Sequence, residues 1–130
     1  MKLAKISIII TAAIYLIIGV MFLTSPVYWV KGIDILLPTP TAIIDLQATY
    51  GGCMFALGIF FLYTYKNLSL IRMGLILQAI TLGGFAFGRF VGILMHGIPK
   101  PIIFYLFIAE ISGVILAIYC LSQMSKTDKI

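Results

Sequence analysis

Long apolar stretches alternate with short polar breaks along the whole chain. Charged residues are absent from 6–24 and from 46–65, and a single charge interrupts each of 73–95 and 102–121. Each stretch is close to the roughly 20 residues that a helix needs to cross a ~30 Å hydrocarbon core. Because a backbone in lipid must pair its polar groups internally, the pattern predicts helices. We expect an all-α integral membrane protein, a four-helix bundle in a single domain, 1–130, with spans at about 6–24, 44–65, 70–95 and 101–122.

The connection between the first two stretches, 25–43, is too apolar for a free loop. It carries Tyr28 and Trp29, side chains that favour the membrane–water interface, so we expect an interfacial segment. A short re-entrant segment and a lid over the bundle are the alternatives. The break at 66–69 predicts a tight turn and an antiparallel hairpin of the second and third helices, and Pro99 and Pro101 separate the third helix from the fourth.

Composition and charge narrow the class of protein further. The 130 residues are 62% hydrophobic and only 10% charged, against roughly 25% charged residues in a soluble domain. This excludes a water-soluble globular enzyme and a disordered chain. No cluster of four basic residues accompanies the net charge of +5, so no nucleic-acid partner is expected.

Basic residues flank the predicted spans unevenly. Lys31 and Lys100 fall on one side of the membrane, and the other side receives Lys2, Lys5, Lys66, Arg72, Lys126 and Lys129. Basic residues concentrate on the cytoplasmic side of membrane proteins. The asymmetry therefore predicts that both termini are cytoplasmic.

Small residues recur at every fourth position in three of the spans. The third span has Gly84, Gly88 and Gly92, the second has Gly52 between Ala48 and Ala56, and the fourth has Gly113 between Ala109 and Ala117. Helices in lipid associate through close packing at such residues. We expect these seams to hold a compact bundle; whether one of them also serves a homo-oligomer is left open.

Apart from Arg72, which belongs to the cytoplasmic fringe, three charged residues lie within the predicted spans: Asp45, Arg89 and Glu110. At 100° per residue, Asp45 and Glu110 lie on or beside the small-residue faces of their helices, and Arg89 lies beside the glycine seam. Counted from the outer helix ends, Arg89 is roughly 10 Å deep and Glu110 roughly 13 Å deep. An unpaired charge there costs at least ~2.5–3.5 kcal/mol. We therefore expect a buried cluster of all three charges in the outer half of the membrane.

Further polar residues are expected to line this cluster. Thr49, Tyr50 and Gln78 support it from the second and third spans, and His96, the only histidine, lies at the outer rim. His96 is an interfacial residue or, alternatively, a proton-exchange or gating group. The predicted ligand-binding site thus comprises these four residues and the three charges. A substrate, proton or ion site and a structural ion pair that fixes helix register are both open interpretations.

Neither a cofactor nor a metal is expected. Cys53 and Cys120 lie in apolar runs without CxxC spacing or a neighbouring histidine. No hydrolase, metalloprotease, P-loop or dinucleotide motif is present, so no catalytic residue is assigned and enzymatic activity is undecided.

Four short segments carry a resemblance to a known family: DLQATYGG at 45–52, GRFVG at 88–92, GIP at 97–99, and Glu110 in the last span. They resemble a bacterial four-helix membrane family, a domain of unknown function that is similar to DoxX-like proteins, over nearly the whole chain. The resemblance implies a four-helix bundle in the plasma membrane, the bacterial inner membrane, and implies no reaction. DoxX-like relatives are associated with quinone-linked oxidoreductase complexes.

Three hypotheses about function follow. The first is a small multi-pass membrane protein whose Asp45–Arg89–Glu110 cluster binds or transports a small ligand, a lipid head group or a proton. The second is a membrane enzyme acting on a lipid-soluble substrate, such as a quinone, isoprenoid or sterol, with Glu110 as general acid or base and Arg89 polarising the substrate. The third is an accessory subunit of a larger membrane complex. The lipid bilayer is the expected partner in all three.

Overall fold

Helices make up nearly all of residues 1–127, the part of the chain that a computed structural model describes. Within that part no strand forms, and four helices are long and apolar enough to cross a membrane. They are α1 (Lys2–Thr24), the continuous helix Pro40–Lys66, the helix Leu68–His96, and α6 (Pro101–Thr127). The predicted all-α class with four membrane-length helices is confirmed.

The second and third long helices are assembled from shorter elements. The second contains α3 (Pro40–Leu46), a π-helix, η2 (Gln47–Cys53), and α4 (Met54–Lys66). The third begins with the 3-10 turn η3 (Leu68–Leu70) and continues as α5 (Ile71–His96). An N-terminal cap and a glycine explain where two of these helices begin and end. The Thr39 hydroxyl accepts a hydrogen bond from the Ala42 backbone N–H at 3.3 Å to cap α3, and Gly97 ends α5 at a φ of 90°.

The apolar connection after α1 folds into two short helices, α2 (Pro26–Val30) and η1 (Lys31–Ile33). Its buried side chains are Pro26 and Val30, whereas Tyr28 and Leu36 are exposed. Asp34 follows η1 in the left-handed conformation at a φ of 60°. Its carboxylate accepts a hydrogen bond from the Lys100 ammonium at 2.6 Å, so one exposed ion pair ties this connection to the turn between α5 and α6.

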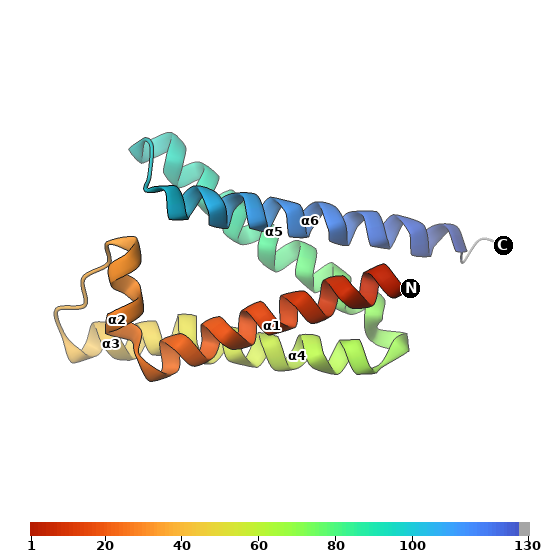
Figure 1. The fold of residues 1–130 in the computed structure, drawn as a ribbon, viewed down its shortest axis with the longest axis horizontal. Helices are drawn as coiled ribbons and strands as arrows, with labels where there is room; N and C mark the ends of the chain where they lie inside the picture. The colour runs from red at the N-terminus through yellow and green to blue at the C-terminus, as the bar shows by residue number, and fades with distance from the viewer. Residues whose placement is uncertain (128–130) are drawn as a thin grey trace.

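The long helices are arranged as two pairs (Figure 1). α1 packs mainly against α4, and α5 packs mainly against α6, with fewer contacts between the pairs. The pairs lie close together near the chain termini, which we call the terminal end, and diverge toward α2 and the α5–α6 turn, which we call the loop end. The chain does reverse at Asn67, but the expected packing of the second span against the third is minor.

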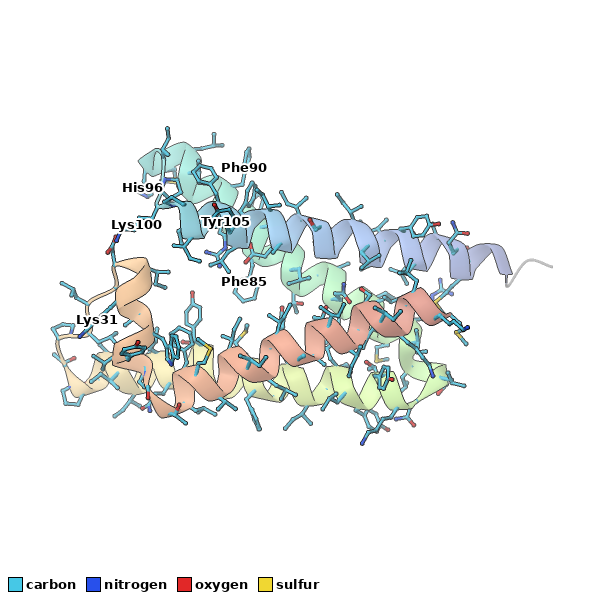
Figure 2. All side chains as sticks on the ribbon, viewed as in Figure 1. Lys31, Phe85, Phe90, His96, Lys100 and Tyr105 are labelled. Carbon is cyan, nitrogen blue, oxygen red and sulfur yellow. The ribbon has the colours of Figure 1, made fainter. Side chains whose placement is uncertain are left out.

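Basic residues follow this division into two ends. Lys2, Lys5, Lys66 and Arg72 belong to the terminal end, and Lys31 and Lys100 belong to the loop end (Figure 2). Lys129, which the sequence placed with the first group, lies outside the described residues, as does the side chain of Lys126.

The buried core lies in the terminal half of the bundle. It is built from α1, α4, the first half of α5 and the last half of α6, with Tyr15 and Phe61 in edge-to-face contact at 5.3 Å between ring centroids. Facing outward from the long helices are large apolar side chains, for example Ile10 and Ile17 of α1. Such a surface suits lipid rather than water. The members of the core are Ala4, Ile8, Ala12, Tyr15, Met54, Phe61, Ile71, Leu75, Ala117 and Cys120.

Glycines permit close contacts between helices, but most of the glycines that do so lie outside the predicted seams. A Cβ atom added to Gly19 would lie 2.7 Å from the Phe55 backbone nitrogen, and one added to Gly58 would lie 2.7 Å from Leu16 Cγ. Gly113 likewise packs tightly against Leu82. These contacts join α1 to α4 and α5 to α6.

Two of the expected seams are wrong for this chain. A Cβ atom on Gly84, Gly88 or Gly92 would meet nothing within 4 Å, because the face of α5 that carries them is turned away from the other helices. Gly52 also lacks a close neighbour on α1, and Gly51 approaches Leu23 instead. The π-helix η2 explains this shift, since its wider turns break the 100° spacing on which the expectation depended.

The glycine contacts predict the effect of adding a single methyl group. We expect Gly19→Ala to destabilise the protein by about 1–3 kcal/mol, because its Cβ atom would collide with the backbone of Phe55. Gly84→Ala is the matched control and should leave stability unchanged or slightly higher. Thermal unfolding in detergent measures both variants. Equal stability of the two would contradict the described packing of α1 on α4.

Candidate functional site

An ion pair between α5 and α6 is the main polar feature inside the loop half of the bundle. Arg89 Nε donates to both carboxylate oxygens of Glu110, each at 2.9 Å. The Glu110 side chain is 10% exposed and the Arg89 side chain 23% exposed. Two charges at this depth avoid the cost of isolated charges in lipid by pairing. The sequence-based expectation of an Arg89–Glu110 contact therefore agrees with the geometry.

Asp45 does not join this pair, which corrects the expected cluster of three charges. Asp45 is an exposed residue of α3, and among the described residues it takes part in no salt bridge. The expectation assumed regular helical spacing from Asp45 to Ala56. The π-helix between them breaks that spacing, so the face on which Asp45 lies cannot be read from the later residues of the span.

Two other predicted site residues lie in the π-helix and face different surroundings. The Thr49 hydroxyl, on an exposed residue, donates to the backbone carbonyl of Asp45 at 2.9 Å. The Tyr50 ring packs against Phe22 of α1, with ring centroids 5.4 Å apart. Neither has a described contact with Arg89 or Glu110. Their assignment to a ligand site remains a prediction.

Gln78 is fully used in joining three helices. Its amide nitrogen donates to Ser7 Oγ of α1 at 2.8 Å and to the Gly113 carbonyl of α6 at 3.0 Å. Its amide oxygen lies 3.1 Å from the same Ser7 hydroxyl, and the residue is only 1% exposed. This cluster, which we call the Gln78 clamp, holds the two helix pairs together in their terminal half. A ligand-binding role for Gln78 remains a prediction that would compete with these bonds.

Tyr15, which the sequence reasoning did not single out, brings a further polar group into the interior. It is 1% exposed, and its hydroxyl is the one buried side-chain polar atom in the described part of the chain without a hydrogen-bond partner. Glu110 lies within electrostatic range of this hydroxyl. Thr81 also lies beside the Tyr15 hydroxyl, and its own hydroxyl donates to the Gln78 carbonyl at 3.4 Å. Tyrosine prefers the membrane interface, so a tyrosine in mid-span was a signal that could have identified it.

Tyr15, Arg89 and Glu110 lie at similar depth. Measured along their own helices from the loop end, all three lie about 10–14 Å down. They come from α1, α5 and α6, and Glu110, which is bonded to Arg89, lies within electrostatic range of the Tyr15 hydroxyl. We call these three residues the Arg89 site.

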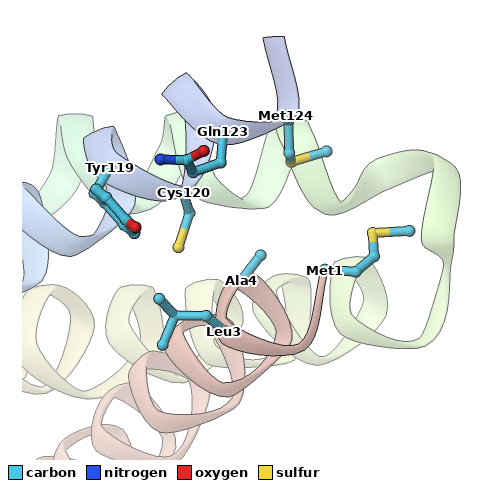
Figure 3. A pocket seen from close by; sticks show the side chains of 7 residues that line it. All are labelled: Met1, Leu3, Ala4, Tyr119, Cys120, Gln123 and Met124. Carbon is cyan, nitrogen blue, oxygen red and sulfur yellow. The ribbon is translucent and has the colours of Figure 1, made fainter. Parts of the chain in front are cut away.

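The remaining candidate, His96, lies apart from this site. It is the last residue of α5 and is exposed near the loop end (Figure 2). Two surface hollows also lie elsewhere. One, of about 530 Å³, lies between α1 and α6 at the terminal end and is lined by residues that include Ala4 and Cys120 (Figure 3). The other, of about 460 Å³, lies beside α2 and η2.

In the described residues no three His, Cys, Asp or Glu side chains lie close enough together to hold a metal ion.

Breaking the ion pair from one side should cost more than removing it entirely. We expect Arg89→Leu and Glu110→Leu each to lower stability by about 2.5–3.5 kcal/mol, because each leaves one charge without its partner in the membrane interior. The double variant should recover most of that loss. Unfolding in mixed detergent measures the cycle. Asp45→Asn is the control and should leave stability unchanged; additive losses in the double variant would contradict the pairing.

Comparison with known proteins gives a family and no function. A search of the curated proteins finds no significant match, and a search of the solved structures finds none either. The family model of a domain of unknown function, DUF4345, matches residues 3–121, which is nearly the whole chain. The protein therefore belongs to the DUF4345 family.

Proposed function

We propose that the protein binds a lipid-soluble ligand whose polar group accepts hydrogen bonds from Arg89. The observation that carries the proposal is the incomplete use of the Arg89 guanidinium. Of its five N–H groups, only the one on Nε has a partner in the described part of the chain. The four N–H groups on the two terminal nitrogens remain available to a ligand.

The geometry of the pair favours binding over a purely structural lock. Arginine and carboxylate usually pair through two parallel hydrogen bonds, which use two guanidinium nitrogens. Here Nε alone serves both oxygens of Glu110, so the terminal nitrogens stay free while Glu110 fixes the guanidinium in place. Polar groups inside a membrane are costly, and those left without protein partners commonly mark functional sites.

The unpaired hydroxyl of Tyr15 supports the same proposal from the opposite helix pair. A buried hydroxyl without a partner costs about 1–3 kcal/mol, which a bound acceptor would offset. A ligand at the Arg89 site would thus gain hydrogen bonds from α1 and from α5. We also propose that the protein lies in the bacterial inner membrane, as its resemblance to DoxX-like proteins implies, and that its termini are cytoplasmic, as the asymmetry of basic residues predicts, so that the loop end faces outward.

Assembly into an oligomer or a larger complex is a second proposal, favoured by a separate observation. The stripe of Gly84, Gly88 and Gly92 faces no other part of the described chain. Such four-residue repeats of glycine are the usual contact surface between membrane helices. The two proposals are compatible, because this stripe and the Arg89 site use different faces of α5.

Removing the Tyr15 hydroxyl should separate binding from stability. We expect Tyr15→Phe to raise the stability of the ligand-free protein by up to about 1–3 kcal/mol, because it removes an unsatisfied buried hydroxyl. The same change should reduce the fraction of protein that retains a small molecule in native mass spectrometry after gentle solubilisation. Thermal unfolding of delipidated protein measures the first effect.

Tyr105→Phe is the matched control, since Tyr105 is exposed on α6 and should affect neither measurement. Retention of the same molecule by wild type, Tyr15→Phe and Arg89→Gln would disprove the proposed site.

A further inference from the structure

We infer that the Arg89 site takes an uncharged amphiphile whose polar group is a hydrogen-bond acceptor such as a ketone or ester carbonyl, rather than an anionic lipid. The inference rests on the proposed function and specifies the class of ligand. Three features of the site carry it: its balanced charge, the hydrogen-bonding character of its unpaired groups, and its apolar surroundings.

The charge of the site is already balanced within the protein. Arg89 and Glu110 are joined at 2.9 Å, and the described spans bring no other charged side chain to this pair. An anionic group bound to Arg89 would lie close to the Glu110 carboxylate and would give the site a net negative charge. Charges interact strongly in a medium of low dielectric, so this arrangement is unfavourable. An uncharged ligand avoids the repulsion.

The unpaired groups of the site match an acceptor. Arg89 offers four N–H donors and no acceptor, and the Tyr15 hydroxyl adds a fifth donor. Both carboxylate oxygens of Glu110 are already engaged by Nε. A carbonyl oxygen has two lone pairs and can accept from Arg89 and Tyr15 together.

The surroundings of the site suit an apolar chain. The loop halves of α5 and α6 contribute almost no buried residues, and their exposed side chains are large and apolar, among them Phe90 and Ile108. Figure 2 shows Phe85 extending from α5 toward the α1–α4 pair, below the labelled side chains Phe90 and Tyr105. An amphiphile in the bilayer would therefore meet large apolar side chains in the helix halves that carry Arg89 and Glu110.

A competition between matched amphiphiles tests the inference. Wild-type protein in dodecyl maltoside, a detergent without a carbonyl, is mixed with equal amounts of a long-chain methyl ketone, an alkylphosphonate and an alkane of matched length. Native mass spectrometry then reports the fraction carrying each probe. We expect the ketone to exceed the phosphonate by about tenfold in the wild type, because the phosphonate must approach Glu110. Glu110→Gln should reverse the preference, because it leaves the charge of Arg89 uncompensated.

Each alternative result identifies which statement fails. If the wild type carries the phosphonate as well as or better than the ketone, the inference of an uncharged ligand is overturned while binding at Arg89 stands. If all three probes bind wild type and Arg89→Gln equally, the proposed function fails, and this inference fails with it. The ratio in the wild type decides the question alone should Glu110→Gln not fold.

Discussion

The hydrogen bonds of Gln78 link the two helix pairs within the core that all four long helices share. The amide of Gln78 reaches Ser7 on α1 and the Gly113 carbonyl on α6, so one side chain of α5 links both pairs. In lipid no water can replace these bonds, and the polar groups they satisfy would otherwise be stranded. The core lies around this clamp in the terminal half, and the two pairs diverge in the loop half (Figure 1).

Sequence alone could predict the features that each helix acquires on its own, independently of how the helices pack. Hydropathy and length identify membrane helices because lipid acts on each segment separately. The Arg89–Glu110 contact was predictable because opposite charges at equal depth have few other partners. The surroundings of Asp45 and Gly52 could not be predicted, because regular helical spacing fails across the π-helix Gln47–Cys53. Gly84 shows another reason: a small-residue pattern does not reveal whether another helix of the same chain covers it.

Two of the three residues of the Arg89 site could be identified from the sequence. Arg89 and Glu110 stood out because their charges are rare in a membrane span, whereas Tyr15 is uncharged and only its mid-span position distinguished it from an interfacial tyrosine. Its importance depends on a property of the fold, the lack of any partner for its buried hydroxyl. A single sequence cannot report that property, because it requires knowing which groups surround the side chain.

The two ends of the bundle are fastened very differently. Buried hydrogen bonds join the pairs near the termini, and one exposed ion pair between Asp34 and Lys100 joins them at the other end. Exposed ion pairs contribute little and weaken with salt. Any change in the angle between the pairs must therefore occur about the clamped end. Such a change would alter the cross-sectional area of the protein in one leaflet much more than in the other.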